Sequence, residues 1–65
     1  MELTPLRYFR AIAHAGHMTR AARSLGVTQP ALSAMLKKLE LEVGAPLVHR
    51  TPHGVQLTEA GRVFL

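Results

Sequence analysis

The 65-residue chain contains no cysteine, tryptophan, aspartate or asparagine. Without cysteine it can form no disulfide, no thiolate zinc site and no thiol nucleophile. A chain this short lies near the lower size limit for a core that folds without such cross-links. We therefore expect one small domain and exclude a two-domain enzyme. The absence of cysteine also fits a reducing compartment.

Acidic residues are scarce, with four glutamates against eight lysines and arginines and a net charge of +4. This surplus favours a polyanionic partner, and composition alone leaves nucleic acid and an anionic membrane surface open. Catalysis is disfavoured because Ser24 and Ser33 fall in predicted helices without a base evident in the sequence. We predict that the protein is not an enzyme and needs no cofactor.

Long apolar runs are absent as well. No uncharged apolar stretch approaches membrane-spanning length, and no basic stretch precedes an apolar segment at the N-terminus. We therefore expect a cytoplasmic protein without a membrane partner.

Capping and turn residues predict a first helix. Thr4 is a good N-cap, Pro5 suits the first helical position, and Gly16 stops the helix. The predicted buried stripe consists of Leu6, Phe9, Ile12 and Ala13.

Two further helices follow in quick succession. Thr19 opens a segment of about two turns that Gly26 closes, and Thr28 caps a longer helix that ends at Gly44. The buried face of the longer helix is predicted to hold Leu32, Leu36, Leu39 and Val43. A short helix, a tight turn and a longer helix are the helix-turn-helix layout, which we place at about 18–37.

The rest of the chain predicts a β-hairpin and the start of another helix. The β-prone runs 47–50 and 55–57 flank 51–54, where Pro52 and Gly54 supply turn chemistry. Thr58 caps a final helix with Glu59 in its first turn, and Leu65 follows after barely two turns. We expect this helix to be the beginning of a longer one.

The exposed side of the helix over 28–43 is small, polar and basic, which suits the DNA major groove. Thr28, Gln29, Pro30 and Ser33 would enter first. Gln29 is the base-reading candidate because an amide can bond adenine at two atoms, although it could instead cap the helix or face solvent. Thr28 and Ser33 are expected on the DNA backbone, and Pro30 can touch a thymine methyl group.

Basic residues around this helix are the candidates for phosphate contacts. Lys37 and Lys38 lie further along it, and Arg50 ends the first hairpin strand. For each lysine the alternative is a solvated surface charge. Arg20 on the second helix is a weaker candidate for a phosphate contact. The predicted DNA-binding set also includes Ala34 on the exposed face of the helix over 28–43 and His53 in the hairpin turn.

Several stretches carry a resemblance to a known family. They are Leu6-Arg7-Tyr8-Phe9, Thr19-Arg20-Ala21-Ala22, Val27-Thr28-Gln29-Pro30-Ala31-Leu32-Ser33, Leu39-Glu40, Gly44-Ala45-Pro46-Leu47-Val48-His49-Arg50 and Leu57-Thr58-Glu59-Ala60-Gly61. In this order and spacing, the whole chain resembles the N-terminal winged helix-turn-helix of LysR-type transcriptional regulators.

The resemblance implies a mostly α winged helix-turn-helix: a three-helix core, a hairpin wing and the start of a linker helix. Residues 1–58 would be the DNA-binding domain, with the wing at about 47–57, and 59–65 the truncated start of the linker helix. The helix over 28–43 would enter the major groove of an operator or promoter, with the wing on the backbone.

The resemblance also implies a homodimer or tetramer formed through the linker helix, in the bacterial cytosol and nucleoid. A C-terminal domain outside this chain would bind a small-molecule inducer.

The chain departs from the family pattern at a few positions. Ala34 stands where the family often has arginine, and Leu41 where a polar residue is usual. Val48 replaces phenylalanine, and His17-Met18 replaces Ser-Phe. Without a cation at position 34, DNA affinity would depend more on Lys37, Lys38 and the wing.

Three other interpretations are weaker. A zinc site could combine His14 and His17 with His49 and His53, but no cysteine or aspartate completes it and Gly16 interrupts the first pair. A membrane-surface role would need the apolar side chains of the first helix, which the core uses better. A winged helix that binds protein, supported by the apolar Leu41, is the serious rival, and its association would be insensitive to salt.

Overall fold

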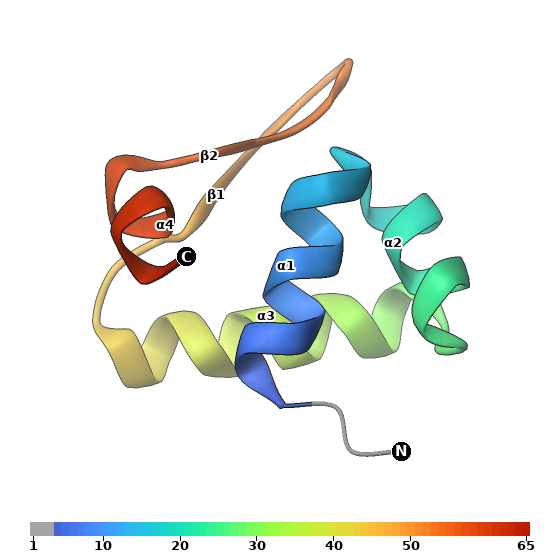
Figure 1. The fold of residues 1–65 in the computed structure, drawn as a ribbon, viewed down its shortest axis with the longest axis horizontal. Helices are drawn as coiled ribbons and strands as arrows, with labels where there is room; N and C mark the ends of the chain where they lie inside the picture. The colour runs from blue at the N-terminus through green and yellow to red at the C-terminus, as the bar shows by residue number, and fades with distance from the viewer. Residues whose placement is uncertain (1–3) are drawn as a thin grey trace.

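Helix α1 crosses helix α3, and helix α2 flanks both of them (Figure 1). The computed structural model describes residues 4–65. In this range the elements are α1 (Pro5–Ala15), α2 (Met18–Leu25), α3 (Gln29–Val43), β1 (Val48–Thr51), β2 (Gly54–Leu57) and α4 (Glu59–Phe64). The two strands form one antiparallel hairpin. The predicted fold class, a mostly α winged helix-turn-helix, is confirmed.

Threonine side chains start three of the helices, as the sequence predicts. The hydroxyl of Thr4 accepts the Arg7 N–H at 3.4 Å, and that of Thr28 accepts the Ala31 N–H at 3.2 Å. Thr58 caps α4 in the same way, with Gly61 as the donor at 3.0 Å. These caps are local, so each replaces a hydrogen bond that the first turn of a helix lacks.

Helix α2 begins differently from the prediction. Its first residue is Met18 and its N-cap is His17, whose side chain makes no capping hydrogen bond, so the expectation that Thr19 opens the helix is wrong. Met18 is buried in the core, so packing sets this end of the helix. The other end is as predicted, with Gly26 in the left-handed conformation at φ 72°.

The core lies where the three helices meet the segment before the hairpin. Its buried members are Tyr8, Phe9, Ile12, Met18, Ala21, Ala22, Leu32, Leu36, Leu39 and Leu47. The predicted burial of Leu6 and Val43 is wrong, because each is 43% exposed. Both lie in terminal turns that project past the crossing of α1 and α3 (Figure 1). Tyr8 is buried instead, and its hydroxyl donates to the Met35 carbonyl at 3.1 Å.

The hairpin is tighter than predicted. Thr51 and Gly54, expected in the turn, pair with each other at the ends of the strands, while Leu47, expected in the first strand, is a core residue before it. The Thr51 hydroxyl donates to the Gly54 carbonyl at 3.0 Å and accepts the His53 N–H at 3.2 Å. These bonds close the turn around two residues only.

Close backbone contacts hold the hairpin against the helices at both of its ends. Gly54, at φ 136°, lies so close to the Gly16 carbonyl that a Cβ atom would overlap it, and the neighbouring Val55 N–H donates to that carbonyl at 2.9 Å. At the other end, Gly61 of α4 packs against the Leu47 carbonyl, where a Cβ would also overlap. Phe64 of α4 packs edge-on against Phe9, with ring centroids 5.4 Å apart.

Across residues 4–65, every helix is too short or too polar to cross a membrane.

Candidate nucleic-acid interface

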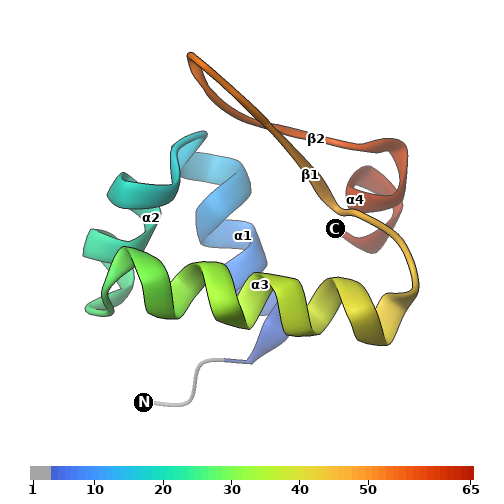
Figure 2. The ribbon, with the colours of Figure 1, turned by 180° about the vertical axis from the view of Figure 1, so that it is seen from behind.

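Helix α3 presents one face to solvent because its other face forms the core. Leu32, Leu36 and Leu39 are buried against α1 and α2, which leaves the opposite side of the helix uncovered. Figure 2 shows α3 in front of α1, with this side toward the viewer. The exposed residues there include Pro30, Ala34, Lys37, Lys38 and Leu41.

Ser33 joins the start of α3 to the hairpin. Its hydroxyl oxygen accepts a hydrogen bond from Nε2 of Gln29 and another from Nη2 of Arg50, both at 2.9 Å. A serine hydroxyl has two lone pairs and one hydrogen, so these bonds use its accepting capacity and leave the O–H to donate. In this arrangement Ser33 can bond only an acceptor, such as a phosphate oxygen or the N7 or O6 atom of guanine.

A groove of about 400 Å³ runs between α3 and β1. Its lining consists of Ser33, Ala34, Leu36, Lys37, Glu40, Val48 and Arg50. Four of these, Ser33, Ala34, Lys37 and Arg50, belong to the predicted DNA-binding set. The structure therefore brings part of the helix and the wing to one surface.

The carboxylate in this groove is already engaged. Oε2 of Glu40 accepts the Leu47 N–H at 2.7 Å and the Val48 N–H at 3.4 Å. These bonds fasten the beginning of β1 to α3 and direct the acceptor atom toward the protein backbone. A buried N–H group without a partner is costly, so Glu40 helps hold the hairpin beside the helix.

The start of α3 offers fewer free amide groups than its position suggests. Pro30 has no N–H, the Ala31 N–H donates to Thr28, and the Leu32 N–H donates to the Thr28 carbonyl at 3.0 Å. Within the first turn this leaves the Gln29 N–H for an anion. The Thr28 hydroxyl accepts one bond and keeps its hydrogen to donate.

A second, smaller hollow lies between the start of α2 and the hairpin, and measures about 210 Å³. Gln29 and Arg50 line it together with Thr19, Thr51 and Pro52. Gln29 therefore lies where α2, α3 and the hairpin converge, rather than on the helix surface alone.

Some predicted site residues lie apart from these grooves. Arg20 faces a different groove, between α1 and α2, and His53 is exposed at the tip of the hairpin. Lys38 is exposed and lines neither groove beside the hairpin. The roles of all ten residues in DNA binding stay predictions.

The structural role of Glu40 and the bridge from Ser33 to Arg50 have no signal in the sequence. Leu39-Glu40 matched the family pattern, but nothing local signals that the carboxylate binds amides seven and eight residues later. Arg50 is seventeen residues from Ser33, so no spacing rule for helices or hairpins connects them. As for metals, residues 4–65 hold no group of three or more potential ligands.

Comparison with known proteins agrees with the geometry. The family model for bacterial regulatory helix-turn-helix proteins of the lysR family matches residues 3–62. The HTH-type transcriptional regulator BudR of Klebsiella aerogenes is 58% identical over 64 residues, which cover 98% of this chain and 45% of that protein. AlsR of Bacillus subtilis (strain 168) is 52% identical over 65 residues, or 100% of this chain and 22% of that protein. The chain thus spans less than half the length of these relatives.

Two solved structures are similar over nearly the whole chain. The CbnR DNA-binding domain in its DNA complex has a TM-score of 0.90 and 43% identity, covering 100% of this chain and 75% of that chain. The BenM DNA-binding domain in complex with catB site 1 DNA has a TM-score of 0.88 and 41% identity, covering 98% of this chain and 72% of that chain.

Proposed function

The chain belongs to the lysR family of bacterial regulatory helix-turn-helix proteins, and on that premise we propose that it binds duplex DNA as the promoter-reading domain of a transcriptional regulator. Helix α3 enters the major groove and the hairpin lies along the phosphate backbone. The observation that carries this proposal is the hydrogen bond from Arg50 to Ser33, which holds a cation of the hairpin against the exposed face of α3. The similar CbnR and BenM domains are in complexes with DNA.

Base reading is assigned to the first turns of α3. Gln29 uses one amide hydrogen on Ser33, which leaves its other hydrogen and its oxygen for an adenine edge. Ser33 donates its remaining hydrogen to a DNA acceptor, and Thr28 donates to phosphate. Pro30 and Ala34 offer apolar contact to thymine methyl groups.

Phosphate binding is assigned to the cations around this surface. The exposed side chains are those of Lys37 and Lys38 on α3 and of Arg50 on β1. Arg20 lies on α2. His53, exposed at the tip of the hairpin, is assigned to the adjacent DNA backbone. If the four lysine and arginine side chains each neutralise one phosphate, log K should fall with log salt with a slope of about −3.6.

The test is fluorescence anisotropy of labelled duplexes across a salt series, with protein up to about 10⁻⁴ M because non-specific binding is weak. Lys37→Ala should weaken operator and random duplexes alike and reduce the slope by about 0.9. Gln29→Ala should cost about 1–3 kcal/mol at one base pair of an operator and little on random DNA. Equal losses on both duplexes would remove Gln29 from the base-reading set.

Arg62→Ala is the matched control, because Arg62 is exposed on α4 and lies outside the proposed surface. Its salt slope should equal that of the unmodified chain. A folded protein that retains no DNA at low salt would overturn the proposal. Salt-insensitive binding to a protein partner would then favour the rival, a protein-binding winged helix with the 75% exposed Leu41 at its contact.

The same proposal covers the protein beyond this domain. Residues 1–58 are the DNA-binding domain, and 59–65 begin a linker helix through which homodimers or tetramers form. Val63 and Leu65 on that segment are 82% and 50% exposed, which suits a surface covered by a partner. A separate domain binds the small-molecule inducer, and the regulator acts in the cytoplasm without catalysis or a cofactor.

A further inference from the structure

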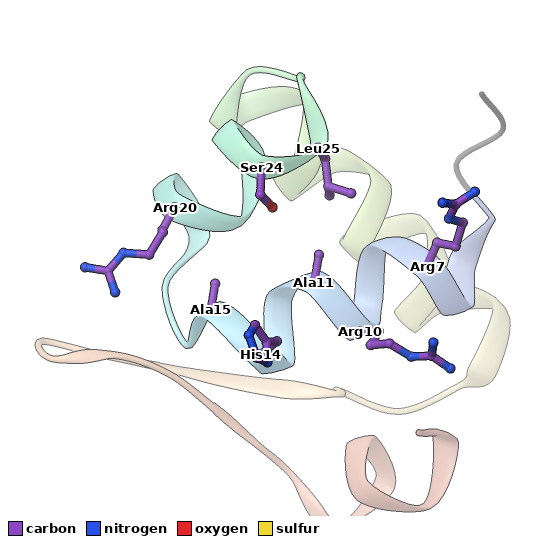
Figure 3. Close-up of a pocket in the computed structure, with 8 residues that line it drawn as sticks. All are labelled: Arg7, Arg10, Ala11, His14, Ala15, Arg20, Ser24 and Leu25. Atoms are coloured by element: carbon purple, nitrogen blue, oxygen red, sulfur yellow. The ribbon is translucent and has the colours of Figure 1, made fainter.

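A groove of about 700 Å³ lies between α1 and α2. Figure 3 shows Ala11 and Ala15 directed from α1 toward α2, and Leu25 directed back toward α1. These three side chains are half-buried and form an apolar floor. The proposed DNA-binding function does not account for this groove.

Arginine and histidine side chains surround that floor. Arg7 and Arg10 lie toward one end of the groove, Arg20 lies at the other, and His14 lies along the edge between them (Figure 3). No carboxylate belongs to the lining. Three guanidinium groups without an acid among them repel one another weakly, and they match carboxylates with paired hydrogen bonds.

The groove faces away from the proposed DNA surface. Helix α1 lies in front of α3 in Figure 1 and behind it in Figure 2, and α3 is behind the groove in Figure 3. A duplex lying on the exposed face of α3 would therefore leave the α1–α2 groove uncovered. Its arginines, apart from Arg20 at the end of the groove, remain available to another partner.

Shape and chemistry select the kind of occupant. The three arginines and the histidine of the rim are exposed and none of the lining is buried, whereas small-molecule sites enclose most of their ligand. A DNA backbone would use the rim but gain nothing from the apolar floor. A helix that carries acidic side chains beside one apolar side chain would use both the cationic rim and the apolar floor.

We propose that the α1–α2 groove docks an acidic, amphipathic segment of another protein while α3 holds DNA. The partner inserts an apolar side chain over Ala11, Ala15 and Leu25 and places its carboxylates against Arg7 and Arg10, while Arg20 stays with the DNA backbone. A second copy of this chain supplies this poorly, because its few glutamates include Glu40, which is bonded to the hairpin backbone. Peptide docking requires only the α1–α2 face, so it can be tested without DNA.

The probe is a labelled synthetic peptide of about 15 residues, with glutamates flanking one leucine at helical spacing. A control peptide carries glutamine in place of every glutamate. We compare Arg10→Glu, in the groove, with Arg62→Glu, which changes the net charge equally on exposed α4. Circular dichroism establishes that each variant is folded.

The unmodified chain should bind the acidic peptide and not the glutamine peptide. Arg10→Glu should weaken binding by about tenfold, whereas Arg62→Glu should change it by less than about twofold. Both variants should keep equal affinity for duplex DNA, and peptide should bind the DNA complex as well as the free chain. Peptide docking with failed DNA binding would support this proposal and reject the proposed function.

Other outcomes overturn the proposal. Equal losses in Arg10→Glu and Arg62→Glu would mean attraction to net charge alone. Release of peptide by duplex DNA would place the peptide on α3. Arg10→Glu could also leave peptide affinity unchanged. If it then abolished self-association, the occupant of the groove would be a second copy of the chain. If it instead abolished binding to a second duplex, the occupant would be DNA. If the peptide does not bind at concentrations of about 1 mM, the docking proposal is wrong.

Discussion

The helix-turn-helix and the hairpin occupy one surface but keep their positions by different means. Helices α2 and α3 pack through small and branched apolar side chains, with Ala21 and Leu32 fully buried. The hairpin packs only the partly buried Val48, Val55 and Leu57 against the core, and its position depends in addition on single polar atoms: the Glu40 carboxylate, the Gly16 carbonyl and the Ser33 hydroxyl. Apolar packing is shared among many atoms, whereas a hydrogen bond is lost with one. The wing should therefore be displaced by changes that leave the helices in place.

The strongest test of this contrast is Leu32→Ala. Leu32 has no exposed surface, so the substitution should lower the free energy of unfolding by about 2–5 kcal/mol through lost burial and a cavity. Urea unfolding followed by circular dichroism measures the change. Helices and hairpin should unfold together, because the core supports both.

Leu41→Ala is the matched control on the same helix. Leu41 is 75% exposed, so its truncation should change stability by less than about 0.5 kcal/mol. If Leu41→Ala costs as much as Leu32→Ala, the exposed face of α3 is covered in solution and the comparison fails.

Glu40→Ala should act chiefly on the wing. It leaves the Leu47 N–H without its acceptor, which should cost about 1–3 kcal/mol. Hydrogen exchange at Leu47 and Val48 should accelerate more than exchange in α2. Glu40→Gln removes the same charge but keeps an accepting oxygen, so it should lose less than half as much. Equal effects of the two substitutions would show that charge, and not the hydrogen bonds, holds the hairpin.

The same contrast explains what the sequence could predict. Thr4, Thr28 and Thr58 cap helices within their own first turns, so their signals are local and the predicted starts are confirmed. The start of α2 was missed because burial of Met18, a tertiary effect, outweighs capping by Thr19. Periodicity likewise predicts a buried face but not where crossing helices stop covering it.

In the candidate site too, features set by local spacing could be predicted from the sequence, whereas features set by distant contacts could not. Helical spacing predicts that Ala34 and Lys37 share the exposed face of α3, and the structure places both beside β1. The attachment of the hairpin depends on pairs far apart in the sequence, such as Arg50 with Ser33, and on side chains whose partners are backbone atoms. Arg20 is predicted only as a weaker basic candidate on the second helix, and its side chain lines the groove between α1 and α2.

Tyr8 tests a polar contact inside the apolar region. Burial, and secondarily the charge of Glu42, raises the pKa of the Tyr8 phenol above 10.0. The folded state thus favours the neutral phenol, so its contribution is complete below about pH 10 and is lost as pH rises through the raised pKa. At neutral pH, Tyr8→Phe should lower the free energy of unfolding by about 0.5–1.5 kcal/mol. Between pH 8 and about pH 11, the free energy of unfolding should fall less in this variant than in the unmodified chain. Parallel losses in urea unfolding would contradict the raised pKa.

Ser33→Ala should have the smallest effect on stability and tests the point where the two regions touch. Its bonds to Gln29 and Arg50 lie at the surface, so unfolding should change by less than about 0.5 kcal/mol. DNA affinity should fall about two- to tenfold, because the bond from Ser33 to DNA is lost and Arg50 then samples orientations away from α3. Ser24→Ala, which removes a bond within α2 only, should leave DNA affinity unchanged. In a double-mutant cycle, Arg50→Ala should cost less when Ser33 is already alanine. Additive losses would mean that Arg50 reaches the phosphate independently, and that the wing needs no contact with α3 to bind DNA.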